Sequence, residues 1–265
     1  MKLVRFLDAA GAVCQGEPTS DALMHARLGN GNTVGIVKIL PPVAPVNILC
    51  IGLNYRRHAA ESNMAVPERP ILFLKPTSTV IAHGENILHP DTQELDYECE
   101  LAIIIGKAAK NVSEADALNY VAGYTCANDV SARDWQLKLD KQWARGKSFD
   151  TFCPLGPVLV TPDEIKDPDS LQIQTRVNGV MLQNSNTADL IFSTREIISY
   201  LSKDMTLLPG TVILTGTPEG VAMGRTPSPW LKPGDVVEIE IEGIGILKNQ
   251  VVESPSAPAS GGTFS

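Results

Sequence analysis

One stretch, from Leu95 to Gly106, joins an acidic segment to a long apolar run. Its second half, Leu-Ala-Ile-Ile-Ile-Gly, is short for a helix and rich in β-branched residues, so it predicts a buried strand. Side chains alternate along a strand, which places Asp96, Glu98 and Glu100 on one face. A hard divalent cation would relieve their repulsion and make Glu98 and Glu100 a chelating pair. The alternative is an exposed strand end with solvated acids.

Composition limits the class of protein. The 265 residues are 43% hydrophobic, enough for a substantial core. The net charge of -8 argues against nucleic acid as a partner, because a phosphate backbone demands basic surface. Apolar runs fall well short of the roughly 20 residues that a membrane helix needs, and the N-terminal segment lacks the apolar region of a secretory signal. We therefore expect no membrane association and a cytoplasmic location.

The chain divides into three parts by composition. Residues 1–45 show short apolar stretches between polar and Gly-rich segments and end in the Pro-rich connector Pro41–Pro45, which predicts a small N-terminal β lobe. Residues 46–252 form the main domain. The segment 253–265 is rich in Ser, Pro, Ala and Gly and is expected to be a tail without a core to join.

Two local patterns place chemically useful side chains together. A short helix is predicted at Tyr55–Glu61, where His58 and Glu61 share one face at hydrogen-bonding distance; the alternative is a surface histidine beside an acid. If a helix begins near Asp129, then Asp129, Arg133 and Gln136 also line one face.

The remaining sequence patterns predict helices, strands and turns that support the candidate site. Helices are predicted at Ser113–Leu118, with Ser113 as N-cap, and at Ser193–Leu201, which opens with a Ser193/Glu196 capping box. Strands flank an Asn178–Gly179 turn, and a further hairpin follows between residues 236 and 252. The segment 208–220 predicts a strand and a Gly-rich turn whose N–H groups suit an anion, or an ordinary turn.

Taken together, these motifs resemble the fumarylacetoacetate hydrolase superfamily, particularly its compact members that act on acylpyruvates, oxaloacetate and related 2-oxo acids. The resemblance extends over about residues 47–252 and rests on Ile51–Tyr55 before His58, Phe73–Pro76, Leu95–Leu101, Asn128–Asp134, Gly146–Asp150 and Leu214–Pro218. It implies an α+β, β-rich fold, a mixed β-roll or barrel with short helices, and commonly a homodimer. Cys99 stands where relatives often have Gly, and we expect it to pack rather than to bind metal.

The resemblance also implies roles for individual residues. Glu98, Glu100 and Asp129 correspond to the metal ligands. His58 and Glu61 correspond to a dyad on a lid that closes over the substrate, and Lys147 to a charge stabiliser. Arg133, Gln136 and Thr217 match positions that hold the substrate or its supporting water.

The expected chemistry follows from an oxygen-only ligand set, which favours Mg²⁺, with Mn²⁺ or Ca²⁺ as alternatives. Our first hypothesis is hydrolysis of a C–C bond in an acylpyruvate-type 1,3-diketo acid, such as fumarylpyruvate or acetylpyruvate. His58 would deprotonate the attacking water, and cleavage would leave a pyruvate enolate. The same enolate arises in decarboxylation or tautomerisation of oxaloacetate and in isomerisation of a 2-hydroxyhepta-2,4-diene-1,7-dioate. A different class is a non-catalytic Ca²⁺-binding β protein, in which His58, Glu61 and Lys147 would have no purpose.

Overall fold

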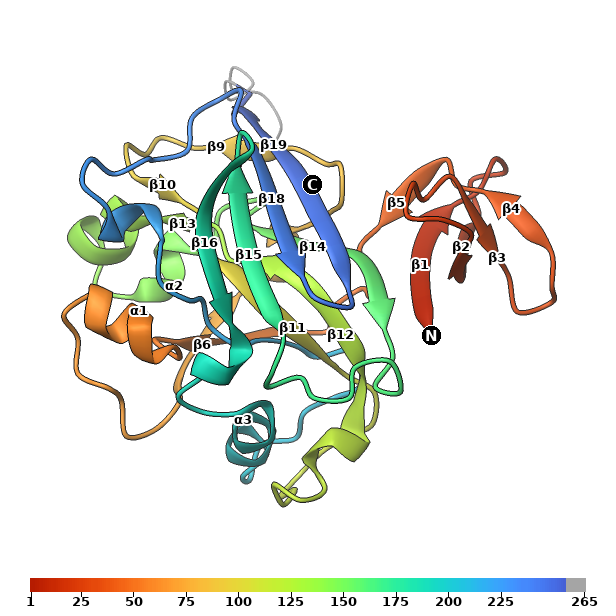
Figure 1. Cartoon of the computed structure of the whole chain (residues 1–265), viewed down its shortest axis with the longest axis horizontal. Helices are drawn as coiled ribbons and strands as arrows, with labels where there is room; N and C mark the ends of the chain where they lie inside the picture. Colours follow the sequence, from red (N-terminus) through yellow and green to blue (C-terminus); the bar gives the residue numbers. More distant parts are fainter. Residues whose placement is uncertain (256–265) are drawn as a thin grey trace, which may run out of the picture.

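The computed structural model describes residues 1–255, and its main elements are β-strands, most of which are arranged in two large sheets (Figure 1). The larger sheet has 12 strands. Its N-terminal part comprises β1 (Lys2–Leu7), β2 (Val13–Pro18), β3 (His25–Arg27), β4 (Thr33–Gly35) and β5 (Lys38–Leu40). These strands form a lobe that projects from one side of the body in Figure 1. Two residues of β1 pair with β14, so the lobe is continuous with the main sheet.

The main part of this sheet runs in the order β14-β12-β11-β17-β6-β7, with β8 paired to β14. Its strands are β6 (Ile48–Gly52), β7 (Ile71–Lys75), β8 (Val80–Ala82), β11 (Cys99–Ile105), β12 (Val121–Asn128), β14 (Cys153–Val160) and β17 (Val212–Leu214). Most pairs are antiparallel, but β17 pairs with β6 and β14 with β8 in parallel, so the sheet is mixed.

A second sheet of five strands has the order β16-β15-β18-β19-β9. Its strands are β9 (Ile87–His89), β15 (Gln172–Val177), β16 (Val180–Asn186), β18 (Val236–Ile241) and β19 (Gly245–Glu253). Residues of β15 and β18 alternate between buried and partly exposed, as expected of strands with one face on a core. The predicted Asn178–Gly179 turn and the hairpin between residues 236 and 252 are both confirmed. A pair of two-residue strands, β10 (Leu95–Asp96) and β13 (Ser131–Ala132), completes the strands of the described residues.

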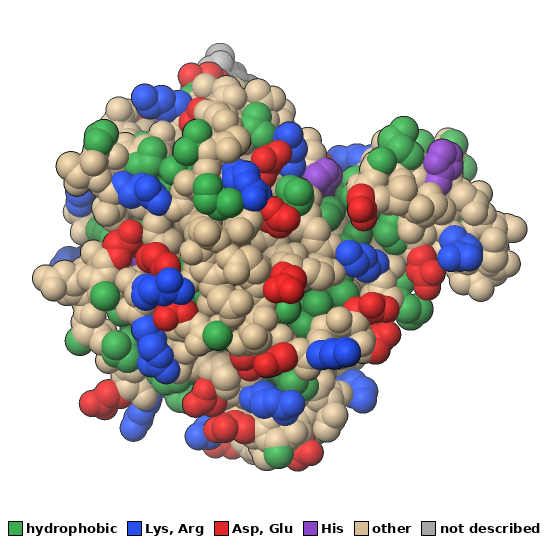
Figure 2. Space-filling model, in the orientation of Figure 1, with side chains coloured by type: hydrophobic (Ala, Val, Ile, Leu, Met, Phe, Trp, Pro, Cys, Tyr) green, Lys and Arg blue, Asp and Glu red, His purple; other side chains and the backbone are tan. Residues whose placement is uncertain are grey.

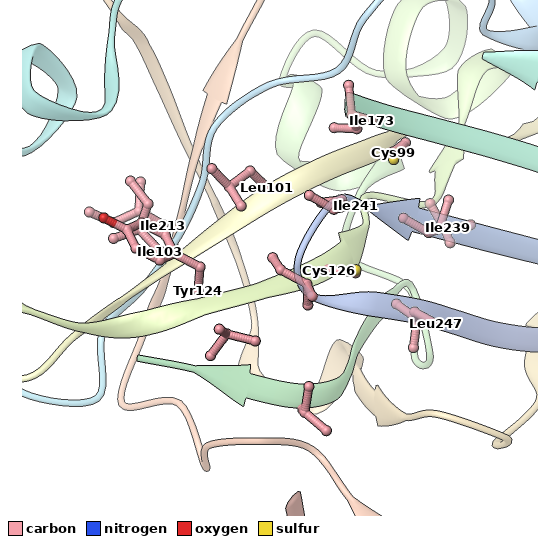
Figure 3. Packing of buried hydrophobic residues seen from close by; sticks show 14 of the residues in the cluster. Cys99, Leu101, Ile103, Tyr124, Cys126, Ile173, Ile213, Ile239, Ile241 and Leu247 are labelled. Atoms are coloured by element: carbon pink, nitrogen blue, oxygen red, sulfur yellow. The ribbon is translucent and has the colours of Figure 1, made fainter. Parts of the chain in front are cut away.

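The main core lies between the two sheets. Figure 3 shows Leu101 of β11 on the side of Ile241 of β18, whereas Ile103 lies next to Ile213 and Tyr124. All seven residues of β11 are buried, because its other face carries a second apolar cluster that includes Ala102 and Ile104. This explains the uninterrupted apolar run in the sequence.

Helices in the described part of the chain are short and few. The α-helices are α1 (Arg56–Glu61), α2 (Trp143–Gly146) and α3 (Thr194–Leu201), with 3-10 turns at η1 (Thr77–Thr79), η2 (Ala117–Tyr120), η4 (Thr187–Asp189) and η5 (Ala222–Gly224) and a π-helical turn at η3 (Trp135–Leu139). The capping box of α3 is confirmed in both directions between Ser193 and Glu196. Within residues 1–255, none of the helices is long and apolar enough to cross a membrane.

The β-rich α+β fold with short helices is confirmed by this architecture. The helix predicted from Ser113 to Leu118 is wrong: the Ser113 hydroxyl accepts from the Asp116 amide in a turn, and only η2 follows. The proposed boundary between residues 45 and 46 stays a prediction, with the Pro-rich segment lying between β5 and β6. The predicted tail begins at the last residue of β19, and its residues 256–265 lie outside the described part of the chain. On the face shown in Figure 2, acidic and basic side chains are interspersed.

Candidate metal centre and active site

Three buried carboxylates meet where β11 begins and β12 ends. Glu98 precedes β11, Glu100 is its second residue, and Asp129 follows β12. The two strands are antiparallel and pair Cys99 with Asn128, so the Asp129 amide donates to the Glu98 carbonyl at 3.0 Å. One oxygen from each of the three carboxylates lies within 4.8 Å of the others. The structure thus brings together all three predicted ligands.

The predicted continuous strand from Leu95 is interrupted at Tyr97 and Glu98, between β10 and β11. The backbone amides there donate to side chains: Glu98 to Asn128 Oδ1 and Cys99 to Gln183 Oε1, both at 3.0 Å. The acids still converge despite this break. Cys99 packs in the main core, as expected, with its thiol donating to a backbone carbonyl (Figure 3).

Three buried cations surround the carboxylates. Lys147, at the end of α2, donates to Glu98 Oε2 at 2.7 Å and to Asp129 Oδ2 at 2.8 Å. Lys75 donates to Asp129 Oδ1 at 2.5 Å, and Arg133 Nη2 lies 2.6 Å from Glu98 Oε1. Burial alone would raise the pKa of Glu98, but the charges of Lys147 and Arg133 outweigh it and lower the pKa to about 2.

Glu100 differs from the other two acids. Its carboxylate accepts from the Gly216 amide at 2.6 Å, yet no lysine or arginine among residues 1–255 forms an ion pair with it. Burial, together with the charges of Asp129 and Glu98, raises its pKa well above the ordinary value. A buried carboxylate without a cationic partner, beside two more oxygen donors, fits a hard divalent cation such as Mg²⁺, which Glu98, Glu100 and Asp129 would hold.

His58 and Glu61 lie on α1, and the predicted short helix is confirmed with Arg56 as its first residue. His58 Nδ1 is 3.3 Å from Glu61 Oε2. The helix is fixed from outside by Arg57, which pairs with Glu219 at 3.2 Å and with Asp189 at 3.6 Å. The dyad geometry predicted from the spacing is therefore present.

The helix predicted to begin near Asp129 is wrong. The Asp129 amide donates to the Glu98 carbonyl, and Ser131–Ala132 forms β13. Helical geometry begins only at Arg133 and Asp134, directly before η3, and the Asp134 side chain caps the amide of Trp135. The side chains of Arg133 and Gln136 nevertheless meet, with Arg133 Nη1 donating to Gln136 Oε1 at 2.9 Å. Arg133 and Gln136 lie three residues apart in this helical segment, as the spacing predicted, and only Asp129 lies outside it.

Thr217 lies in the turn that follows β17. Gln183 Nε2 donates to Thr217 Oγ1 at 2.9 Å, which leaves the hydroxyl hydrogen of Thr217 available to a ligand.

A single pocket connects these groups. Seven of the nine predicted residues line it, namely His58, Glu98, Glu100, Arg133, Gln136, Lys147 and Thr217. The other two, Glu61 and Asp129, stand behind His58 and Lys147 respectively. Apolar side chains, among them Phe73, Trp143 and Met223, complete the wall. The pocket thus offers a polar floor and an apolar side to a small acid.

Sequence reasoning assigned no role to two residues that the structure places at the site. Lys75 is buried against Asp129, and Asp96 accepts from Arg133 Nε at 2.8 Å. A signal existed for Lys75, because a lysine at the end of an apolar strand, two residues after Phe73, shares the face of that aromatic side chain. No signal identified Arg133 as the partner of Asp96.

The fold and site define a β-rich enzyme with a buried acidic metal centre. Residues 47–252 match the family described as "Fumarylacetoacetate (FAA) hydrolase C-terminal", and the chain belongs to this family. It is 50% identical over 218 residues to "Oxaloacetate tautomerase Fahd2a, mitochondrial" of Rattus norvegicus, an alignment that covers 82% of this chain and 70% of the rat protein.

Two solved structures support the same assignment. A 5-carboxymethyl-2-hydroxymuconate delta-isomerase from Mycobacterium smegmatis superposes with a TM-score of 0.84 at 39% identity, covering 97% of this chain and 100% of that one. A fumarylacetoacetate hydrolase from psychrophilic Exiguobacterium antarcticum superposes with a TM-score of 0.84 at 36% identity, covering 96% and 100%.

Proposed function

We propose that this protein is a Mg²⁺-dependent keto–enol tautomerase of a short 2-oxo dicarboxylic acid such as oxaloacetate. The observation that carries the proposal is the placement of His58, with Glu61 behind it, in the pocket that Glu98 and Glu100 also line. An acid–base group opposite a carboxylate centre is what proton transfer next to a 2-oxo group needs. The name of the rat relative, at 50% identity, supports the same activity.

His58 is the residue that moves the proton. When Nδ1 carries its hydrogen toward Glu61, Nε2 has a free lone pair that accepts the proton from C3 of the substrate. The C3–H electron pair becomes the C2–C3 double bond, the π pair of the 2-oxo group moves to its oxygen, and that oxygen takes the proton back from His58 to give the enol. A divalent cation bound by the three carboxylates would polarise the 2-oxo group and stabilise negative charge on its oxygen.

The other pocket residues bind and orient the substrate. Gln136 uses its oxygen to accept from Arg133, so its amide N–H groups are left to donate to a substrate carboxylate. Thr217 offers its hydroxyl hydrogen in the same way. Lys147 keeps Glu98 and Asp129 in place and offsets their charge, so that an anionic substrate can approach.

Hydrolysis of an acylpyruvate, our first reading of the sequence, becomes the second candidate. The Exiguobacterium structure is named as a hydrolase, and its fold covers 96% of this chain. Hydrolysis needs an attacking water in addition to every group that tautomerisation uses. The named relatives and the M. smegmatis isomerase favour proton transfer.

One set of assays separates these reactions. Purified protein with Mg²⁺ is given oxaloacetate, acetylpyruvate or fumarylpyruvate, while the enol absorbance and the release of pyruvate are followed. We expect rapid keto–enol exchange of oxaloacetate with little pyruvate. The His58→Ala variant should lose roughly 10²- to 10⁴-fold of this rate. His25→Ala, which changes an exposed histidine of the N-terminal lobe, is the matched control.

Two outcomes would contradict the proposal. Pyruvate release that outpaces exchange would identify a hydrolase or decarboxylase. Equal tautomerase rates for His58→Ala and His25→Ala would remove His58 from the mechanism.

A homodimer, expected from the family resemblance, is part of the proposal. The edge strand β7 exposes Leu72 and Leu74, with 39% and 52% of their surface accessible, on the side opposite Phe73 and Lys75. Apolar side chains on a sheet edge favour association. Sedimentation of the purified protein at several concentrations measures the oligomeric state directly.

A further inference from the structure

The carboxylate of Glu61 lies against a turn that belongs to a distant part of the chain. The amide N–H of Gly220 points between its two oxygens, with distances of 3.0 Å to Oε1 and 3.1 Å to Oε2. Oε2 is also the atom that faces His58 Nδ1 at 3.3 Å. The turn therefore fixes the group that orients the proposed base.

The space for this carboxylate exists because residue 224 is glycine. A Cβ at Gly224 would lie 2.6 Å from Glu61 Oε1 and 2.8 Å from Glu61 Cγ, both closer than real Cβ contacts. The atoms it would meet are the far end of a flexible side chain rather than backbone. An added methyl group would consequently push the Glu61 carboxylate away more easily than it would disturb the fold.

The turn itself is held firmly. The Asp96 carboxylate accepts from the Ala222 amide at 2.7 Å and from the Met223 amide at 3.2 Å. The Gly220 carbonyl accepts from the Tyr97 hydroxyl at 3.0 Å and from Arg225 Nε at 3.1 Å. Since the turn is anchored on Asp96 and Tyr97, Glu61 has to adapt to the turn.

We propose that Gly220 and Gly224 are positioning residues for the His58–Glu61 dyad. Gly220 supplies the N–H that holds the Glu61 carboxylate, and Gly224 leaves the room in which it sits. Through Glu61 they fix the ring of His58 toward the pocket. This inference rests on the proposed function, because it assigns the two glycines to the proton transfer that His58 performs.

Gly224→Ala tests the inference, with Gly29→Ala as the matched control, because a Cβ at Gly29 meets nothing within 4 Å. We expect kcat for oxaloacetate tautomerisation to fall by roughly 10- to 100-fold in Gly224→Ala, the scale of a misplacement of about 1 Å. The Mg²⁺ concentration for half-maximal activity and the thermal unfolding midpoint should stay near those of the wild type. Gly29→Ala should match the wild type in all three measurements.

A double-mutant cycle shows whether Gly224 acts through Glu61. In a Glu61→Ala background there is no carboxylate for the new methyl group to displace, so Gly224→Ala should cause no further loss. A loss that adds to that of Glu61→Ala, or a Gly224→Ala variant with normal kcat beside an impaired Glu61→Ala, would overturn the inference alone. Full activity of Glu61→Ala would overturn both the inference and the proposed dyad.

Discussion

Arg133 Nε donates to Asp96 Oδ2 at 2.8 Å, with the Asp96 side chain fully buried. The same guanidinium contacts Glu98, and the same carboxylate holds the amides of Ala222 and Met223. Asp96 therefore links the carboxylate centre to the turn on which Glu61 rests. The Asp96 carboxylate therefore helps to position both the metal centre and the His58–Glu61 dyad.

Asp96→Asn should weaken that support. The substitution keeps an acceptor but leaves Arg133 without one of its two counter-charges, and breaking a buried ion pair costs roughly 3 kcal/mol. We expect this decrease in the free energy of unfolding by urea denaturation, together with lower tautomerase activity. Asp91→Asn, an exposed acid five residues earlier, is the control. Equal free energies of unfolding for the two variants would show that Asp96 does not stabilise the protein in this way.

Lys75→Met should destabilise the metal-free protein by about 3 to 5 kcal/mol, because it leaves the buried charge of Asp129 with Lys147 as its remaining ion-pair partner. A divalent cation can replace the missing charge. We therefore expect Mg²⁺ to raise the urea midpoint of Lys75→Met more than that of the wild type. The exposed substitution Lys107→Met should show neither effect. If Mg²⁺ raises the urea midpoint of all three proteins equally, Lys75 and the ion do not compensate the same charge on Asp129.

Local signals in the sequence predicted much of this arrangement. The alternation expected of a strand predicted that Glu98 and Glu100 lie on one side, and the two carboxylates do converge although Glu98 precedes β11. The β-branched run correctly predicted a buried β11. The capping box of α3 and the His58–Glu61 pair each involve residues three apart, so short-range spacing was sufficient.

Contacts between distant residues were beyond such reasoning. Lys75 and Asp129 are 54 positions apart, and only the pairing of whole strands brings them together. The predicted helix at Asp129 failed for the same reason, since the Asp129 amide bonds to the Glu98 carbonyl, a partner that no local pattern reveals. The grouping of Asp129 with the two glutamates came from the family resemblance rather than from spacing.

His83 should make stability depend on pH outside the metal centre. Burial lowers its pKa from 6.5, with Lys248 contributing, and its Nδ1 accepts from the Lys248 amide at 3.2 Å. His83 therefore binds a proton more weakly in the folded protein than in the unfolded chain. The neutral His83 side chain contributes to the free energy of unfolding above pH 6.5, and this contribution is lost as the pH falls from 6.5 toward the lower folded pKa.

His83→Asn tests this contribution. We expect the free energy of unfolding to fall less steeply on acidification below pH 6.5 than in the wild type. His25→Asn, an exposed histidine, should keep the slope of the wild type. If the free energy of unfolding falls equally steeply with pH in both variants, a group other than His83 determines the loss of stability in acid.

The last prediction concerns Glu100, the acid that forms no ion pair with a lysine or arginine of residues 1–255. In the absence of metal, Glu100→Gln should increase the free energy of unfolding above pH 7, because burial and the charges of Asp129 and Glu98 already disfavour its ionised form. In the presence of metal the order should reverse. Losing a ligand should weaken Mg²⁺ binding by roughly 10- to 100-fold or more, as measured by calorimetry, so Mg²⁺ stabilises the wild type and not the variant. Tautomerase activity should disappear on chelation and return with Mg²⁺ in the wild type and in the exposed control Glu114→Gln. A general structural defect would lower stability under both conditions, and full turnover after exhaustive chelation would rule out the metal centre.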